Sequence, residues 1–551
     1  TEDTGSNNTA VGTFALETLN YDGAGANTAV GYNAGASLST GIQNTLVGAE
    51  AGDALTDGTR NVAIGYTSLG SETGGDRNIA IGMDALRVQD GANYNTAVGD
   101  SAGEMLTTGE DNVFVGGLAG DAITTGSKNV AVGMLALSAE DAHGKNTAIG
   151  YSTLNAQDAG VDAYNVAVGY EAGKTVSTGF YNTIVGGLAG DALTTGIRNV
   201  AIGFVALSAE DTGSQNTAVG AYALEALNYD GAAANTAVGY YAGPAISTGI
   251  QNTLLGAFAG DALTTGSNNT AIGFEALSTE DGHSSNTAIG FQTLKAQNAG
   301  VDAYNVAVGH QAGLLVSTGE QNVLIGGKAG DALTTGHYNI AIGYQALSTE
   351  DAHGYNVAIG RDALKVQNAG ANAYNVAIGY STGLAVTTGA NNVLMGGFAG
   401  DALTTGNQNV AIGRSALSSE DAHGYNVAIG SYALLMQDAG ADAHSVAVGY
   451  GTGSAITTGT YNTLMGAYSG DALTTGGRNT AIGYLTLSAE DAHGRNIAIG
   501  HKALIVQDAG ADAYNTAVGY QAGLNVTTGT KNVIVGGNAG DSLTSGVNNV
   551  A

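Results

Sequence analysis

Residues 356–374 are Asn-Val-Ala-Ile-Gly-Arg-Asp-Ala-Leu-Lys-Val-Gln-Asn-Ala-Gly-Ala-Asn-Ala-Tyr, and the first five residues of this stretch decide the fold. The pattern of asparagine, any residue, a small or apolar residue, Val, Ile or Leu, and glycine recurs along the chain of 551 residues. Three 17-residue spacings and one 19-residue spacing separate successive asparagines, so that four blocks make a 70-residue super-repeat. One super-repeat is shorter, because Asn78 and Asn95 have the shorter spacing where the other super-repeats have the longer one.

This period predicts an all-β fold, a parallel β-solenoid with one rung of 17–19 residues per block and about 32 rungs. A unit of this length is too short for a pair of helices, and its frequent glycines disfavour helix. The β-branched residues after each asparagine favour strands, and the Gly, Asn and Asp clusters between them favour turns. We expect a single continuous array over residues 1–551. We also expect a window of a longer array, because the chain begins and ends inside the repeat frame.

Two columns of the repeat are predicted to form structural ladders. The asparagine is replaced once, by Ser445, and is expected to stack at a corner, where its backbone tolerates the left-handed region. The glycine four residues later is expected at the next corner, where a positive φ or close packing excludes a Cβ. The predicted ladder residues are Asn8, Asn27, Asn44, Asn61, Asn78, Asn146, Asn216, Asn286, Asn356, Asn426, Asn496, Gly12, Gly31, Gly48 and Gly65.

Both faces of each predicted strand are apolar. Val357 and Ile359 share one face, and Ala358 lies on the other. The position of Ala358 holds Leu, Ile or Phe in the third block of each super-repeat, as at Phe114. A strand that is apolar on both faces is typical of a layer covered on two sides. One layer is the rung's own second segment, and we expect a neighbouring chain to supply the other, which predicts an oligomer.

The composition excludes several functions. The formal net charge is −31, which repels phosphate backbones and anionic lipids, so no nucleic-acid partner is predicted. The chain has no cysteine, which excludes disulfides and thiolate chemistry. It contains no apolar run of the roughly 18 residues or more that a membrane span needs, so we expect no such span within this segment.

The recurring Asn-Thr/Val-Ala-Val/Ile-Gly block resembles the Asn-Ser-Val-Ala-Ile-Gly repeat in the heads of trimeric autotransporter adhesins of the YadA type. It also resembles repeats of some bacteriophage tail fibres. The resemblance implies a left-handed β-roll, a homotrimer, an unidentified surface receptor, and a place on a cell surface or virion. The repeat here is longer than the usual one of that family. The block is also similar to the Asn-x-Val-x-Gly repeat of grass ice-binding proteins.

Two acidic motifs are candidate sites. When the 19-residue block is counted as the first of each super-repeat, several fourth blocks contain Glu-Asp-Ala-His, as at Glu140, Asp141 and His143. We expect this motif to form a solvated turn. A cation site and acid–base chemistry are the alternatives. Third blocks contain Gly-Asp-Ala-Leu, whose aspartate is expected to cap a turn, with calcium binding as the alternative. The calcium candidates are Asp53, Asp121, Asp191, Asp261, Asp331 and Asp401. No other cofactor and no catalytic residue is predicted.

The expected function is structural, as the shaft of an extracellular or virion fibre engaged in surface attachment or filament formation. The alternative is a binding module, either an adhesin head or an ice-binding surface. Pairs such as Thr194 and Thr195 are compatible with ice binding, and frequent tyrosines such as Tyr374 are compatible with adhesion. A binding head predicts one face rich in Tyr or Thr on every rung, whereas a shaft has no such face. An enzyme is not expected, because a cleft needs unique residues and this chain is almost wholly repetitive.

Overall fold

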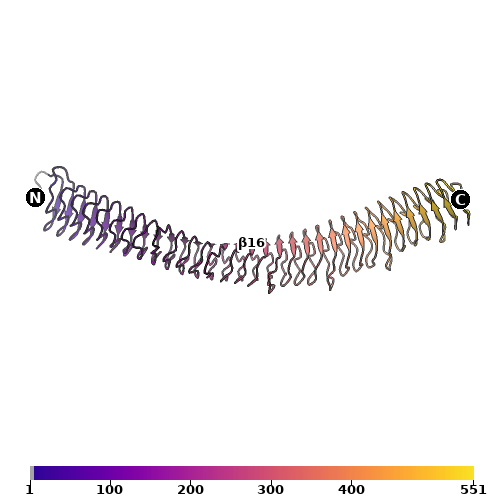
Figure 1. The fold of residues 1–551 in the computed structure, drawn as a ribbon, viewed down its shortest axis with the longest axis horizontal. Coiled ribbons are helices and arrows are strands. Elements are labelled where there is room, and N and C mark those ends of the chain that lie inside the picture. The colour runs from indigo at the N-terminus through magenta and orange to yellow at the C-terminus, as the bar shows by residue number, and fades with distance from the viewer. Residues whose placement is uncertain (1–4) are drawn as a thin grey trace. The chain divides into compact units, whose positions relative to one another are not determined.

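The computed structural model describes residues 5–551, so the predicted fourth-block end at residues 1–3 lies outside the described part. The chain divides into two compact units, Thr1–Ala271 and Ile272–Ala551. Each unit is a parallel β-solenoid in which every turn of chain has one short strand stacked on the next (Figure 1), which confirms the predicted fold class. Over the described residues the chain forms strands, turns and bends but no helix. Accordingly, no helix in that range is long and apolar enough to cross a membrane.

Each strand has three residues and begins directly after the repeat asparagine or its replacement. Strands of the first unit are β1(Thr9–Val11), β2(Thr28–Val30), β3(Thr45–Val47), β4(Val62–Ile64), β5(Ile79–Ile81), β6(Thr96–Val98), β7(Val113–Val115), β8(Val130–Val132), β9(Thr147–Ile149), β10(Val166–Val168), β11(Thr183–Val185), β12(Val200–Ile202), β13(Thr217–Val219), β14(Thr236–Val238) and β15(Thr253–Leu255). The boundary between the units falls within β16(Thr270–Ile272).

Strands of the second unit are β17(Thr287–Ile289), β18(Val306–Val308), β19(Val323–Ile325), β20(Ile340–Ile342), β21(Val357–Ile359), β22(Val376–Ile378), β23(Val393–Met395), β24(Val410–Ile412), β25(Val427–Ile429), β26(Val446–Val448), β27(Thr463–Met465), β28(Thr480–Ile482), β29(Ile497–Ile499), β30(Thr516–Val518) and β31(Val533–Val535). In the last block, Val550 forms an isolated parallel bridge with Val533.

Strand register follows the sequence period. Each strand pairs in parallel with the next, from β1 to β15 in the first unit and from β17 to β31 in the second. Thr9 lies beside Thr28 across the longer spacing of the repeat, and Thr28 lies beside Thr45 across the shorter one. Equivalent residues of successive blocks therefore stack on one another in columns that run along the solenoid.

The core is a narrow stack of columns in which large and small side chains compensate each other. From β2 to β31 the middle residue of every strand is buried. In the core column that contains Leu86, the next two rungs have Gly103 and Gly120, and the rung after these has Leu137. The space above these glycines is filled by the buried ring of Phe114, since a Cβ on Gly103 would lie 2.7 Å from Phe114 Cδ2. The large side chain of Phe114 thus fills the space left by glycines in two rungs, which keeps the core closely packed.

Candidate functional site

The asparagine column forms a continuous hydrogen-bonded ladder along each unit. The backbone N–H of Asn44 donates to Oδ1 of Asn27, and the N–H of Asn61 donates to Oδ1 of Asn44, both at 2.9 Å. The side-chain Nδ2 of Asn44 donates to the carbonyl of Gly58, later in the same block, at 2.9 Å, and also to Oδ1 of Asn27 at 3.2 Å. Each asparagine therefore joins its own rung to both neighbours. All predicted ladder asparagines are buried except Asn8, which is half-buried.

The ladder loses one bond in five of the longer, 19-residue rungs. In the 17-residue rung, Nδ2 of Asn78 donates to the carbonyl of Ala92 at 2.8 Å. In these five longer rungs the two extra residues displace that carbonyl, and the Nδ2 atom is buried without a hydrogen-bond partner. The asparagines affected are Asn146, Asn216, Asn356, Asn426 and Asn496.

The left-handed backbone lies one residue before the position that we predicted. The ladder asparagines are not among the residues with positive φ, whereas Gln43 and Arg60, directly before Asn44 and Asn61, have φ of 64° and 61°. The asparagine is needed for its side-chain bonds, and the corner is made by whichever residue precedes it. The glycine column does have positive φ, for example 132° at Gly12. Its rungs are also in close contact, because a Cβ on Gly12 would lie 2.3 Å from the next glycine's carbonyl oxygen.

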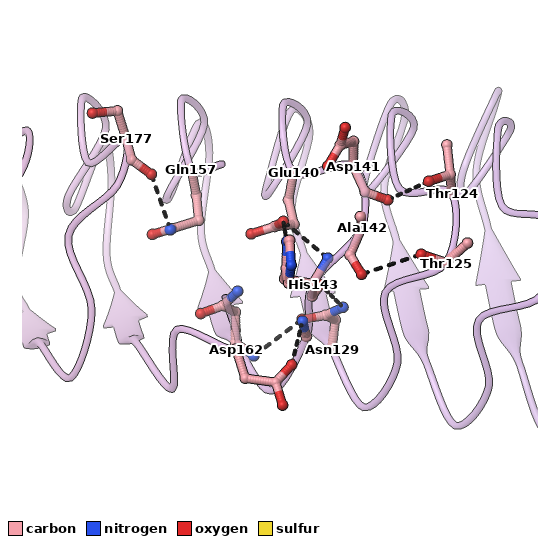
Figure 2. A network of polar contacts seen from close by, with 12 residues as sticks. Thr124, Thr125, Asn129, Glu140, Asp141, Ala142, His143, Gln157, Asp162 and Ser177 are labelled. Atoms are coloured by element: carbon pink, nitrogen blue, oxygen red, sulfur yellow. Dashed lines mark hydrogen bonds and ion pairs between the residues drawn. The ribbon is translucent and has the colours of Figure 1, made fainter. Parts of the chain in front are cut away.

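The glutamate of the fourth block is buried, so the expectation of a solvated Glu-Asp-Ala-His turn was wrong for this residue. Glu140 has no exposed surface, whereas Asp141 is exposed and His143 is half-buried. Figure 2 shows the carboxylate of Glu140 beside the ring of His143, between the turn with Thr124 and the turn with Gln157. The same burial recurs at Glu210, Glu280, Glu350, Glu420 and Glu490.

Glu140 points inward because it belongs to a core column. Gln157 occupies the same position in the next rung, and Val176 and Leu193 follow in the two rungs after that, all of them buried. This alignment was available in the sequence, but the acidic and turn-forming neighbours obscured it. Burial, together with the charges of two nearby aspartates, raises the pKa of Glu140 to about 7. Burial likewise raises the pKa of Glu490 to about 7.

The Glu–His turns place several ligand-type atoms close together. Oε1 of Glu140 accepts a bond of 3.2 Å from the backbone N–H of His143, and the ring Nδ1 lies 3.8 Å from the same oxygen. Asp141 and Asp158 each place a carboxylate oxygen within 4.8 Å of the other ligand atoms of the group. Equivalent four-residue groups contain Glu420, Asp421, His423 and Asp438, and Glu490, Asp491, His493 and Asp508. Three-residue groups surround Glu280 and Glu350.

The aspartates of the third blocks lie apart from these groups. Burial raises the pKa of Asp53, although the backbone N–H groups of Asp53 and Ala54 partly oppose the rise. Burial raises the pKa of the equivalent carboxyls in the same way at Asp121, Asp191, Asp331 and Asp401. Within residues 5–551 the groups of three or more clustered ligand residues do not include this column, in which Asp261 also lies. Calcium binding by this column stays a prediction.

In several third blocks, both threonines of the pair donate their hydroxyls to the next rung. The hydroxyl of Thr124 donates to the carbonyl of Asp141 at 2.6 Å, and that of Thr125 donates to the carbonyl of Ala142 at 3.2 Å. Thr404 and Thr405 bond the following rung in the same way. These hydroxyl protons are therefore engaged within the solenoid.

Aromatic side chains form short exposed stacks along the turns. The rings of Tyr338 and Tyr355 are stacked with centroids 5.0 Å apart, as are those of Tyr355 and Tyr374. His444 lies between Tyr425 and Tyr461 in a second such stack. The spacing is that of the stacked rungs, and such pairs add about 0.5–1.5 kcal/mol beyond their burial.

The outer positions of the strands form an apolar face that this chain leaves half-exposed. Ile64 is 37% exposed, Ile149 39% and Val166 38%, whereas the residues between the outer positions are buried. Strands β1 to β31 contain only Thr, Val, Ile, Ala, Leu, Met and Phe, so the face is uncharged although the chain is strongly acidic.

A shallow depression lined by Thr460, Gly477, Arg478, Arg495 and Asp512 encloses about 190 Å³. This volume is below the roughly 300–1,000 Å³ of typical small-molecule sites.

The sequence matches no family model, and no curated protein matches it significantly. The resemblance to adhesin heads and tail fibres therefore rests on the repeat motif alone.

Proposed function

We propose that this chain forms the shaft of an extracellular or virion fibre, in which further copies of the chain, three in total, cover the apolar strand face. The observation that supports the proposal is the row of half-exposed Val, Ile, Leu and Met side chains at the last position of the stacked strands in each unit. Contiguous apolar surface of this kind marks an interaction site. The fibre would act in surface attachment or filament formation.

The repeat itself favours a second copy as the partner on this face. Residues along the face recur with the rung spacing, as Thr9, Thr28 and Thr45 do. A copy of the same chain has the same rise per rung and therefore stays in register along the face of each unit. The absence of charge on the face lets copies associate despite a net charge of −31 each.

Thiol accessibility tests this proposal, because the chain has no cysteine of its own. Val166 lies on the strand face with 38% exposure, and Val161 lies in the preceding turn with 50% exposure. In full-length protein, a cysteine at Val166→Cys is expected to react at least tenfold more slowly with a soluble thiol reagent than one at Val161→Cys. Similar reaction rates at both positions would show that the face is free and would contradict the proposal.

An adhesive head is the second candidate, supported by the exposed aromatic stacks. Such a head would use the same face on every rung. The position directly after the repeat glycine is Tyr170 or Phe204 on some rungs but Gly187 or Gly327 on third-block rungs. This interruption favours the shaft. The inter-rung bonds of the threonine hydroxyls also weaken the case for ice binding. We propose no catalytic role, since the Glu–His turn is repeated with little variation along the chain.

A further inference from the structure

Five turns pair a buried glutamate with a partly exposed histidine, and in one of them Nδ1 of His283 lies within hydrogen-bond distance of Oε1 of Glu280, at 3.0 Å. The distance from the histidine Nδ1 to Oε1 of the glutamate is 3.8 Å for His143, 3.6 Å for His353, 3.4 Å for His423 and 3.6 Å for His493. Two ligands bonded to one tetrahedral zinc ion at about 2.0 Å lie about 3.3 Å apart. The observed pairs are within a few tenths of an ångström of that separation.

In four of these turns, both partners have a buried side-chain atom without a hydrogen bond. Oε2 of Glu140 has no hydrogen-bond partner although the side chain has no exposed surface, and Nδ1 of His143 has none either. The same two atoms are unsatisfied at Glu350 and His353, Glu420 and His423, and Glu490 and His493. A buried carboxylate oxygen without a partner is costly, and its recurrence at the same place points to a missing positive ligand.

The chain contains its own comparison, in turns where the histidine is absent. Glu72 is followed by Thr73-Gly74-Gly75, and its Oε1 accepts from the N–H groups of Gly74 and Gly75 at 3.0 and 2.5 Å. Its Oε2 accepts from Nε2 of Gln89 at 2.8 Å.

Glu210, also without a histidine, accepts from the N–H groups of Gly213 at 2.6 Å and Tyr229 at 3.4 Å. Both carboxylates are thus satisfied by the protein, Glu72 with the help of Gln89 in the shorter, 17-residue rung and Glu210 by backbone N–H groups alone. Glu210, which precedes a 19-residue rung, is therefore the matched comparison, and it has no unsatisfied oxygen, unlike the glutamates beside a histidine.

We propose that each of these Glu–His turns binds one divalent transition-metal ion, with Zn²⁺ as the best match, between the buried glutamate and Nδ1 of the histidine. Imidazole nitrogen together with carboxylate oxygen suits zinc, whereas calcium and magnesium prefer oxygen ligands alone. The histidine side chains are 27–31% exposed at His143, His353, His423 and His493, so an ion can enter from the surface. The metal would bind neighbouring rungs together wherever the turn recurs.

The five turns fall into two strengths of site. An aspartate of the following rung completes the group at Asp158, Asp438 and Asp508. Asn298 and Asn368 occupy the equivalent position after Glu280 and Glu350, so these two turns lack the last carboxylate. Three tighter and two weaker sites per chain are therefore expected.

Zn²⁺ titration of the full-length, metal-free chain at neutral pH tests the inference, with calorimetry for stoichiometry and Co²⁺ absorption for coordination geometry. Three ions are expected to bind more tightly than two others, and excess Ca²⁺ or Mg²⁺ should not displace them. In the triple variant His143→Gln, His423→Gln, His493→Gln, the three tighter sites should be lost with the circular dichroism spectrum unchanged.

The matched control is the triple variant His310→Gln, His444→Gln, His501→Gln, which removes three histidines outside the Glu–His turns. Its Zn²⁺ stoichiometry should equal that of the unmodified chain. Absence of stoichiometric binding, displacement by Ca²⁺, or equal loss in both triple variants would overturn the proposal. None of these outcomes depends on the shaft proposal, because the ligands of each site come from one chain.

Discussion

The backbone N–H of Asn462 donates to the hydroxyl of Ser445 across 3.4 Å, where other ladder positions have an asparagine Oδ1 at 2.8–3.2 Å. The replacement of asparagine by Ser445 also leaves a neighbouring side chain without a hydrogen bond. At equivalent positions the ladder asparagine also donates to a buried glutamine, as Nδ2 of Asn515 does to Oε1 of Gln507 at 2.6 Å. The shorter side chain of Ser445 cannot reach Gln437, so Oε1 of Gln437 is buried without a hydrogen-bond partner.

Restoring the ladder should stabilise the protein. In Ser445→Asn, the new side chain is expected to accept from the N–H of Asn462 and to donate to Gln437 and Gly459, as Asn515 does to its counterparts. Satisfying one buried acceptor and shortening one bond should add about 1–3 kcal/mol to the free energy of unfolding. Denaturant unfolding and slower amide hydrogen exchange at Asn462 would measure this gain. Ser445→Ala should change stability in the opposite direction, and a destabilised Ser445→Asn variant would contradict the account.

Shortening a 19-residue rung should recover bonds that its length prevents. Deleting Ala369 and Ala373 changes residues 367–375 to Gln-Asn-Gly-Ala-Asn-Tyr-Asn, which matches residues 89–95 except for Asn in place of Asp90. Nδ2 of Asn356 and Nε2 of Gln367, both buried and unsatisfied, should then bond as Asn78 and Gln89 do.

Each recovered group should contribute roughly 1 kcal/mol. Thermal unfolding of the double deletion, measured with chelator present, should therefore show a higher midpoint than that of the unmodified chain. A lower midpoint would mean that the two extra residues stabilise the 19-residue rung through packing, and it would contradict the prediction.

Two glycines with left-handed backbone should differ sharply in their tolerance of alanine. A Cβ on Gly203, where φ is 136°, would lie 2.5 Å from backbone atoms of Gly220, so Gly203→Ala should cost roughly 3–5 kcal/mol. Gly160 has φ of 66° and no atom within 4 Å of a Cβ, so Gly160→Ala should cost about 1 kcal/mol. Denaturant midpoints of the two variants provide the measurement. Equal effects would show that close contact between rungs does not fix the glycine column.

Glu210 should make the protein more stable as the pH falls from 7 to 4.5. Burial raises its pKa from the ordinary 4.5 to about 6, so ionisation disfavours the folded state above pH 6, and this penalty disappears below pH 4.5. A difference of about 1.5 pH units corresponds to about 2 kcal/mol. The unfolding free energy of the unmodified chain minus that of Glu210→Gln should rise by about this amount between pH 7 and 4.5. A constant difference would show that the carboxyl titrates normally.

The period alone was enough to predict the stacking, because equivalent residues of successive blocks must share a column once each rung carries one strand. The register of Thr28 beside Thr45 follows directly. The inward direction of Glu140 was missed because its acidic neighbour suggested a solvated turn, although Leu193 in the same column indicated the core.

The left-handed corner before each asparagine could not be predicted from residue type. Gln43, Arg60 and Tyr94 all occupy it, and the conformation is imposed by the stacked rungs.

The solution mass of the full-length chain, measured by light scattering, tests most directly whether copies of the chain cover the strand face. The account predicts a mass near three times the 54.3 kDa of one chain, both with and without chelator, because the apolar face and not a metal ion holds the copies together. A mass of 54.3 kDa at micromolar concentration would show that the half-exposed strand face is stable in water, and it would contradict the trimeric shaft.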